Sequence, residues 1–188
     1  MDSTKKNILV LCIILFLGAI LFLVFRGGDG RSLEKIVGET KQISIQELGI
    51  TFLIPTDWEE KMKTGGAVGA FFSAQSPGFS ALMLTRDDGK PKFQYANGAI
   101  LNIDAREGTP EDVKKPPRVR TEEQISLGGI QGIYYILDPG DTIENASLYA
   151  FSFSSNGRNF MASFGKSNDY EKGEDIFRAI LSTIRFQK

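Results

Sequence analysis

Residues 49–58 read GITFLIPTDW, and this stretch carries the strongest indication of the fold. Alternate residues of the apolar run Ile50–Ile54 would share one face of a β-strand, and Pro55 ends the strand because it has no backbone N–H. A helical turn or two over residues 57–63 would then carry Trp58, the only tryptophan, back against the sheet. A lone large aromatic in this position predicts a buried packing residue, the alternative being a platform on which a ligand stacks.

The two-residue period of strands continues through most of the chain that follows. Gly128-Gly129 and Asn156-Gly157 predict tight hairpins, because such turns need positive φ at both residues. Ser76-Pro77-Gly78 is a further turn signal between neighbouring strands. Successive hairpins predict an antiparallel sheet. The predicted strands lie at residues 42–47, 49–55, 68–74, 79–85, 99–105, 124–127, 130–137, 147–154 and 158–164.

Helical patterns are fewer, and the clearest lies near the C-terminus. Asn168 or Asp169 would cap this helix, and an apolar stripe at helical spacing would cover the sheet. A second short helix is predicted to begin at Thr109, with Pro110 at its first position. A sheet with segregated helices predicts an α+β domain. The stripe consists of Tyr170, Phe177, Ile180, Leu181 and Ile184.

Aromatic residues crowd the late strands, and both faces of these strands carry rings. A sheet covered on both faces would bury them as core, which is the expectation here. A partly open face would instead offer an aromatic groove for a peptide or apolar ligand. The residues are Tyr134, Tyr135, Tyr149, Phe151, Phe153, Phe160 and Phe164.

Composition excludes several classes of function. The 188 residues are 41% hydrophobic and 24% charged with a net charge of −1, whereas a nucleic-acid-binding domain requires a basic face. The sequence contains no histidine and a single cysteine, Cys12, which lies in an apolar run. A disulfide framework and a Cys/His zinc site are therefore excluded, as is catalysis by histidine.

The N-terminal run Ile8–Phe25 predicts a transmembrane helix. Its eighteen apolar residues span about 27 Å as a helix, close to the thickness of the hydrocarbon core. The run is longer than the core of a typical signal peptide and no small-residue cleavage site follows it, so we expect an uncleaved anchor rather than a cleaved leader. Lys5 and Lys6 precede the run, which places the N-terminus in the cytoplasm.

These patterns divide the chain into three parts. Residues 1–26 are predicted to form a cytoplasmic tail and the single-pass anchor in the cell membrane. Residues 27–41, rich in Gly and charge, would form a flexible tether, within which Leu33–Val37 could form a helical turn. Residues 42–188 would form the extracytoplasmic domain.

Carboxylates are the remaining candidates for chemistry. Asp138, Asp141 and Glu144 lie in a turn-rich stretch, and calcium favours closely spaced oxygen ligands. Their spacing does not match an EF-hand loop, so they are weak candidates and we expect no metal and no cofactor. Asp104 and Glu107, or the Asp138 loop, could instead serve a hydrolase or transferase if they shared a pocket.

Four stretches of the chain, taken in order, resemble PsbP-like domains. The resemblance spans residues 42–188 and implies the Mog1/PsbP-like fold, an antiparallel sheet between helical layers (an αβα sandwich). Residues 86–121 fit the family pattern poorly. The stretches are LGITFLIPTDWEE (48–60), ISLGGIQGIYYIL (125–137), YAFSFSSNGRNFMASFG (149–165) and DIFRAILSTIRF (175–186).

The resemblance implies a scaffold rather than an active site, because members of this family differ in role. Together with the predicted anchor, it leads to the hypothesis of a membrane-tethered, non-catalytic module that binds a protein or supports assembly at the cell envelope. The alternatives are a carboxylate-dependent hydrolase or transferase, and a small-ligand or calcium-binding domain of the envelope.

Overall fold

The computed structural model describes residues 32–64, 70–108, 112 and 115–187. The predicted anchor (residues 1–26), the start of the predicted tether and the helix predicted to begin at Thr109 lie wholly or mostly outside the described residues. Within the part that is described, no helix has the length and apolar character needed to cross a membrane.

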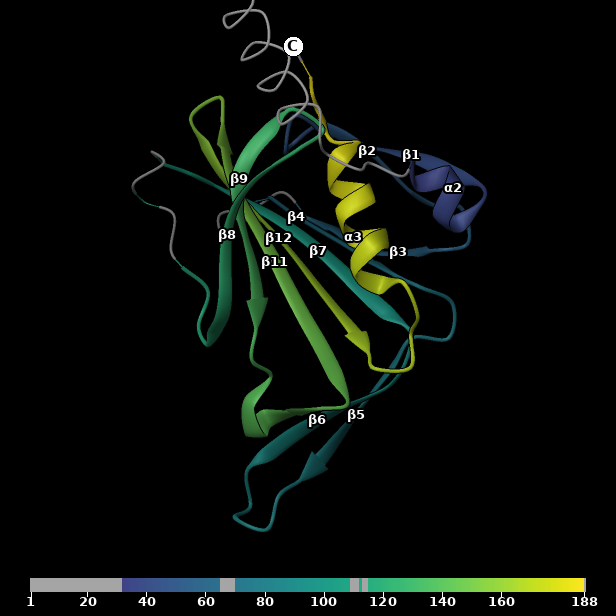
Figure 1. The fold of residues 1–188 in the computed structure, drawn as a ribbon, viewed down its shortest axis with the longest axis vertical. Coiled ribbons are helices and arrows are strands. Elements are labelled where there is room, and N and C mark those ends of the chain that lie inside the picture. Colours follow the sequence, from purple (N-terminus) through teal and green to yellow (C-terminus); the bar gives the residue numbers. More distant parts are fainter. Residues whose placement is uncertain (1–31, 65–69, 109–111, 113–114, 188) are drawn as a thin grey trace, which may run out of the picture.

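An antiparallel sheet of seven strands forms the centre of the molecule (Figure 1), in the order β3-β4-β7-β12-β11-β9-β8. Both predicted tight hairpins are confirmed: Gly128 and Gly129 have φ of 59° and 89°, and Asn156 and Gly157 have φ of 52° and 71°. The strands are β3 (Glu59–Thr64), β4 (Ala70–Gln75), β7 (Ala99–Glu107), β8 (Val119–Leu127), β9 (Ile130–Leu137), β11 (Ala146–Ser155) and β12 (Arg158–Ser167).

Two small sheets and two α-helices complete the described structure. One small sheet has the order β1-β2-β13, with β1 (Thr40–Ile45), β2 (Ile50–Pro55) and β13 (Arg185–Phe186). The other has the order β10-β6-β5, with β5 (Ser80–Thr85), β6 (Pro91–Asn97) and β10 (Ile143–Glu144). The α-helices are α2 (Leu33–Val37) and α3 (Gly173–Ser182), and a 3₁₀ turn, η2, spans Gly140–Thr142.

The main core lies on one face of the large sheet. Helix α3 and the β1-β2-β13 sheet cover this face, and α2 packs beside them (Figure 1). The predicted alternation of β2 is confirmed, because Ile50, Phe52 and Ile54 are buried in this core. The family resemblance implies a helical layer on each side of the sheet. The two described α-helices form one such layer, on the face that carries the main core.

Trp58 is part of the same core. Its side chain is 2% exposed, and its ring stacks on Phe164 at 6.1 Å between centroids. Phe164 in turn stacks on Phe177 of α3 at 5.1 Å. The prediction of a packing residue is therefore confirmed, since this column of rings joins the segment after β2 to the sheet and to the helix.

The late aromatic residues are buried, as expected for core. Because side chains alternate along a strand, the register places all of them on the covered face except Tyr135, which faces the other side. Gly132 provides space for one of these rings: a Cβ at this position would lie 2.6 Å from Phe151 Cζ. The buried set is Tyr134, Tyr135, Tyr149, Phe151, Phe153, Phe160 and Phe164.

Helix α3 carries three residues of the predicted apolar stripe, whereas Tyr170 and Ile184 lie outside the helix, and its start also differs from the prediction. Phe177, Ile180 and Leu181 are buried against the sheet, as expected. The residue before the first turn is Lys172 in the left-handed conformation, with φ of 53° and no side-chain cap, so Asn168 and Asp169 do not cap the helix. These two residues lie instead in the turns that lead from β12 to α3.

Two further sequence-based predictions need correction. Residues 59–64 form strand β3, paired with β4, where a helical turn was predicted. The fold begins before residue 42, within the predicted tether: the helical alternative given for Leu33–Val37 is confirmed by α2, and Leu33 is fully buried. The turn predicted at Ser76-Pro77-Gly78 is confirmed, because the Phe79 N–H donates to the Ser76 carbonyl at 3.1 Å; the strands that flank it do not pair with each other, since β4 pairs with β3 and β7 and β5 pairs with β6.

Candidate functional site

The hairpin formed by β5 and β6 projects from the body of the domain (Figure 1), and we call residues 79–98 the arm. It lies at the opposite end of the molecule from the C-terminus. Chain neighbours on both sides of the arm belong to the large sheet, because β4 precedes it and β7 follows it. The arm is thus an excursion from the centre of the sheet into solvent.

Exposed apolar side chains distinguish the arm from the rest of the described chain. Leu82, Met83, Leu84 and Phe93 are 51%, 73%, 39% and 43% exposed, and they are the large hydrophobic residues that are exposed among the described residues. Met83 lies opposite Phe93 in the register, so these two share one face, while Leu82 and Leu84 occupy the other. Contiguous apolar exposure of this kind is typical of an interaction surface.

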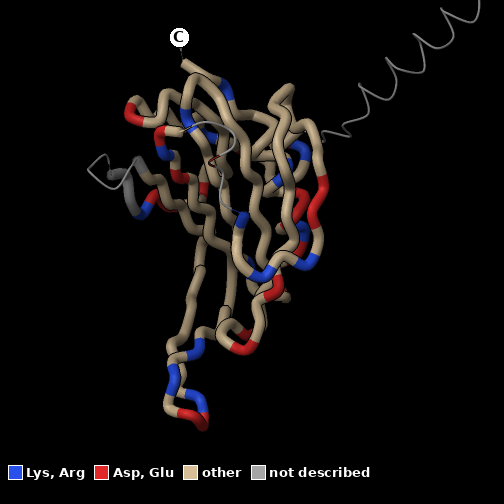
Figure 2. The backbone as a smooth tube through the Cα atoms, turned by 90° about the vertical axis from the view of Figure 1, so that its left-hand side faces the viewer, with Lys and Arg blue, Asp and Glu red and all other residues tan. Residues whose placement is uncertain are grey.

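A tight turn closes the outer end of the arm. The Arg86 N–H donates to the Lys90 carbonyl at 2.9 Å, and the Asp88 carboxylate accepts from the Lys90 N–H at 3.2 Å. Gly89 adopts a φ of 77° in this turn. Charged residues of both signs gather in this outer part (Figure 2), where Asp88 pairs with Arg86 and Lys90 at 3.3 Å and 3.5 Å.

The base of the arm is held by backbone geometry. Ser76 exchanges two hydrogen bonds with Ala99: its N–H donates to the Ala99 carbonyl at 2.9 Å, and its hydroxyl accepts from the Ala99 N–H at 2.8 Å. Gly98 has φ of 73°, and a Cβ there would lie 2.6 Å from Ser76 Oγ and 2.9 Å from Phe79 Cα. This close approach requires glycine.

Tyr95 anchors β6 on the body. Its ring makes an edge contact with Phe79 at 5.4 Å between centroids, and a Cβ on Gly165 of β12 would lie 2.8 Å from its Cε2. Burial raises the pKa of the Tyr95 hydroxyl. Since Gly165 has no side chain, the tyrosine packs directly on the backbone of the large sheet.

The stretch that contains Asp138, Asp141 and Glu144 supports the arm from the side. Strand β10 pairs in parallel with β6, and the Glu144 carboxylate forms an ion pair with Lys92. The Asp141 carbonyl accepts from Arg86 Nη1 at 3.3 Å, whereas Asp138 Oδ1 accepts from the Gly140 N–H at 2.9 Å within its own loop. Among the described residues, no group of three or more acidic, Cys or His side chains is placed to hold a metal ion.

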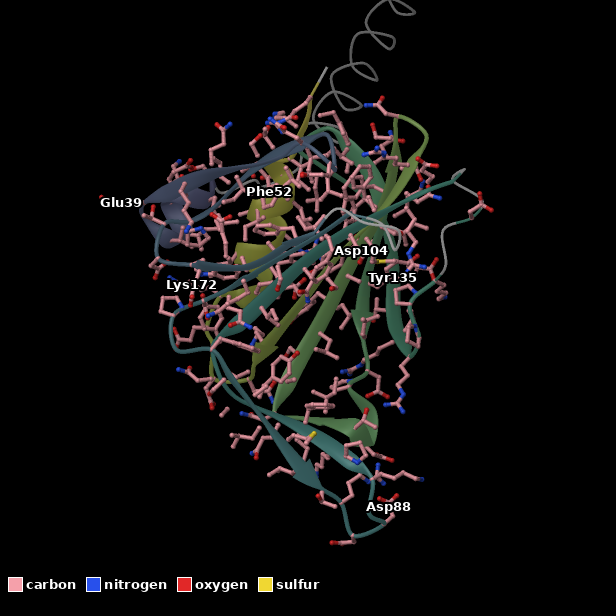
Figure 3. The ribbon with its side chains drawn as sticks, turned by 180° about the vertical axis from the view of Figure 1, so that it is seen from behind. Glu39, Phe52, Asp88, Asp104, Tyr135 and Lys172 are labelled. Atoms are coloured by element: carbon pink, nitrogen blue, oxygen red, sulfur yellow. The ribbon has the colours of Figure 1, made fainter. Side chains whose placement is uncertain are left out.

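The other carboxylates named as candidates do not converge. Asp104 and Glu107 are three residues apart on β7, so their side chains point to opposite faces of the sheet. Asp104 lies on the face of the large sheet that points away from α3. Tyr135 lies on the same face, and Figure 3 labels both residues. Burial raises the pKa of the Asp104 carboxyl, and the neighbouring Arg106 partly opposes this. Tyr135 reaches the Ser152 hydroxyl on this face, at 3.5 Å.

The exposed residues of the arm were not identified as a site from the sequence. The segment SALMLT (residues 80–85) has apolar residues at both odd and even positions, the pattern expected of a strand buried on both faces. One signal could have identified the exposed arm. The partner strand β6, PKFQYAN, is largely polar, whereas both strands of a hairpin buried on two faces would be apolar.

No family model and no curated protein matches the sequence. Solved structures do match. A crystal structure of a protein from Bacteroides thetaiotaomicron shares the fold with a TM-score of 0.51 at 13% identity; the match covers 79% of this chain and 48% of that chain. The chain thus spans about half the length of that protein.

Two other solved structures match at lower similarity. One is the solution structure of cyanobacterial PsbP (CyanoP) from Synechocystis sp., with a TM-score of 0.49 at 15% identity, covering 85% of this chain and 96% of that chain. The other is LpqN, involved in cell envelope biogenesis of Mycobacterium tuberculosis, with a TM-score of 0.39 at 12% identity, covering 86% and 100%. At these identities the likenesses concern the fold alone.

Proposed function

We propose that the chain is a non-catalytic binding module of the cell envelope that engages another protein through the arm. The observation that carries this proposal is the placement of Leu82, Met83, Leu84 and Phe93, the exposed large hydrophobic residues of the described chain, on one projecting hairpin. Water is expelled from such side chains when a partner covers them, which favours association by roughly 25 cal/mol per Å² of apolar surface.

The charges of the arm favour a protein over a lipid bilayer as the partner. Arg86, Asp87, Asp88 and Lys90 lie in the turn that closes the arm, so insertion of the arm end-on would carry four charged side chains into hydrocarbon first. Charged side chains are expensive to place there. A protein that lies alongside the arm can instead cover the apolar residues and leave the charged turn in water.

Support at the base makes the arm a preformed surface. Tyr95 and the Ser76–Ala99 bonds fix it to the large sheet, and β10 and the Lys92–Glu144 pair hold its side. A surface that is already ordered loses little conformational entropy on binding. This favours recognition by the arm over a role as a loose loop.

The N-terminal run Ile8–Phe25 supports location at the membrane. We propose a single-pass anchor with a cytoplasmic N-terminus and an extracytoplasmic domain, on the basis of the length of this run and its flanking lysines. N-terminal sequencing of the membrane-bound protein checks this. A chain that begins near Gly27 would show cleavage and would overturn the anchor.

Photocrosslinking of the full chain in intact cells tests the role of the arm. A photoreactive amino acid replaces Met83 in one variant and Gln124, an exposed residue of β8, in the matched control. We expect covalent adducts with protein from position 83 that are absent from position 124. Equal adduct patterns from both positions, or no adduct from position 83, would contradict a binding role for the arm.

A further inference from the structure

The edges of the sheets differ in how they are protected against pairing with another chain. Strand β3 (EEKMKT) and strand β8 (VRTEEQISL) form the two edges of the large sheet, and both carry several charged residues. Strand β5 (SALMLT) forms an edge of the small sheet, is exposed along its whole length and carries no charge. Charged residues are a common means of preventing edge-to-edge association, and β5 lacks them.

The outward hydrogen-bonding groups of β5 can be assigned from its pairing with β6. The Arg86 N–H bonds to the Lys90 carbonyl, and antiparallel pairs alternate between bonded and non-bonded positions. Counting back along the register from this bond, Leu84 and Leu82 bond to β6, whereas Thr85, Met83 and Ala81 direct their N–H and C=O groups away from it. These three residues form an edge, centred on Met83, with which no other strand of the described chain pairs.

Both faces of β5 expose apolar side chains, which limits the kind of partner that fits. Leu82 and Leu84 lie on one face and Met83 on the other. A flat protein surface could cover one face only. A strand added alongside β5 contacts both faces, because its own side chains alternate in the same way.

We propose that the strand added to β5 is β5 of a second copy of the chain, in an antiparallel pair with its two-fold axis at Met83. This deepens the proposed function, on which it rests, by identifying the partner of the arm. With Met83 opposite Met83 of the other copy, Ala81 lies opposite Thr85 and Leu82 opposite Leu84. All three outward-facing residues then bond, and each of these cross-strand pairs is uncharged.

The charged turn agrees with this register. Continuing the same count, Arg86 lies opposite Ser80 of the other copy, and the residues beyond it lie beside the stretch Ser76–Phe79, which has no charged side chain. The two turns are at opposite ends of the pair, so their like charges do not meet. Pairing in the parallel sense would instead place the two turns side by side.

Disulfide crosslinking of the full chain in its membrane tests the register. Every variant also carries Cys12→Ser, because Cys12 is the only natural cysteine. In the proposed pair the two Met83 Cα atoms are about 5.5 Å apart, within the range of a disulfide. On mild oxidation we expect Met83→Cys to shift from the monomer to the dimer position on a non-reducing gel.

Two further variants make the result specific. Leu82 lies opposite Leu84 rather than opposite itself, so Leu82→Cys alone would place its thiols on Cα atoms roughly 7–8 Å apart, beyond disulfide range. We expect little dimer from Leu82→Cys or Leu84→Cys alone and restored dimer when the two are co-expressed. Ser126→Cys, at an exposed position of the charged edge β8, is the matched control and should stay monomeric.

The outcomes separate this inference from the proposed function. Dimer from Leu82→Cys alone as abundant as from Met83→Cys, or no more dimer from Met83→Cys than from Ser126→Cys, would overturn the self-pairing. If position 83 still gives photoadducts with a different protein, the arm binds a foreign partner and the proposed function stands. Without adducts at position 83, both fail.

Discussion

The core around Trp58 and the arm contain similar apolar residues in opposite settings. In the core, a column of rings from Trp58 through Phe164 to Phe177 excludes water and joins three elements of the fold. On the arm, Leu82 and Met83 are more than half exposed and contact solvent on both faces of a hairpin. Hydrophobicity alone therefore does not locate the core, because the topology decides which apolar strands are covered.

The largest effect should come from breaking the column of rings. Trp58→Ala is expected to lower the free energy of unfolding by about 3–5 kcal/mol, since it removes a large buried side chain and leaves a cavity. Urea-induced unfolding followed by circular dichroism measures this loss. An unfolding midpoint close to that of the wild type would contradict a structural role for the ring.

The base of the arm should be the next most sensitive place. Gly98→Ala puts a Cβ 2.6 Å from Ser76 Oγ and 2.9 Å from Phe79 Cα, and the resulting shifts should cost about 1–3 kcal/mol beyond backbone strain. Gly89→Ala is the matched control, because it has similar positive φ of 77° but no atom within 4 Å of the new Cβ. It should cost only about 1–2 kcal/mol, the penalty of left-handed backbone. Equal losses for both variants would show that the base can relax.

Asp104 should have a smaller effect, which depends on pH. Its pKa is raised by burial in the folded protein, so between the ordinary pKa of an aspartate and the raised value the folded state binds more protons than the unfolded state. Its contribution to stability therefore falls as pH rises through this window. Asp104→Asn should be more stable than the wild type at neutral pH, with a difference that shrinks on acidification.

Denaturant unfolding of both proteins across this pH range measures the effect of Asp104. If Asp104→Asn were instead less stable than the wild type at neutral pH, the charged carboxylate would have a stabilising partner on the sheet. The sign of the difference is the informative result, because it reports whether burial or pairing dominates.

The smallest effect on stability should come from the exposed residues of the arm. Leu82→Thr and Met83→Thr keep the β-propensity of the strand and remove side chains that are mostly in water, so each should change the free energy of unfolding by no more than about 0.5 kcal/mol. Both should nevertheless reduce photoadducts formed from position 93, where a probe replaces the exposed Phe93. A large loss of stability would show that these residues belong to the folded core.

Much of the fold could be predicted from the sequence because local signals were strong. Asn156-Gly157 and Gly128-Gly129 fix two hairpins, and the alternation of β2 fixes its buried face. The stripe on α3 identifies its packing surface. These features depend on neighbouring residues, so pattern and structure agree.

The errors occur where tertiary context overrides the local pattern. Residues 59–64 lack an apolar period and became a strand because the edge of β4 was available for pairing. Lys172 occupies the position before α3 although Asn168 and Asp169 are better capping residues, because these two lie in the turns that follow β12. The arm was missed for the same reason. The sequence of β5, SALMLT, does not indicate that this strand pairs with β6 outside the large sheet.

The pairing of β4 with β7 has a consequence for how this domain could change over evolution. Gln75 lies opposite Ile100, and Ser76 bonds to Ala99. Strands β4 and β7 therefore pair as an ordinary antiparallel hairpin would, with residues 77–98 in the place of its turn. A short turn in place of residues 77–98 would join the same two strands without moving either. Binding specificity could therefore be gained, lost or exchanged among descendants by replacing one segment, while the scaffold is inherited intact.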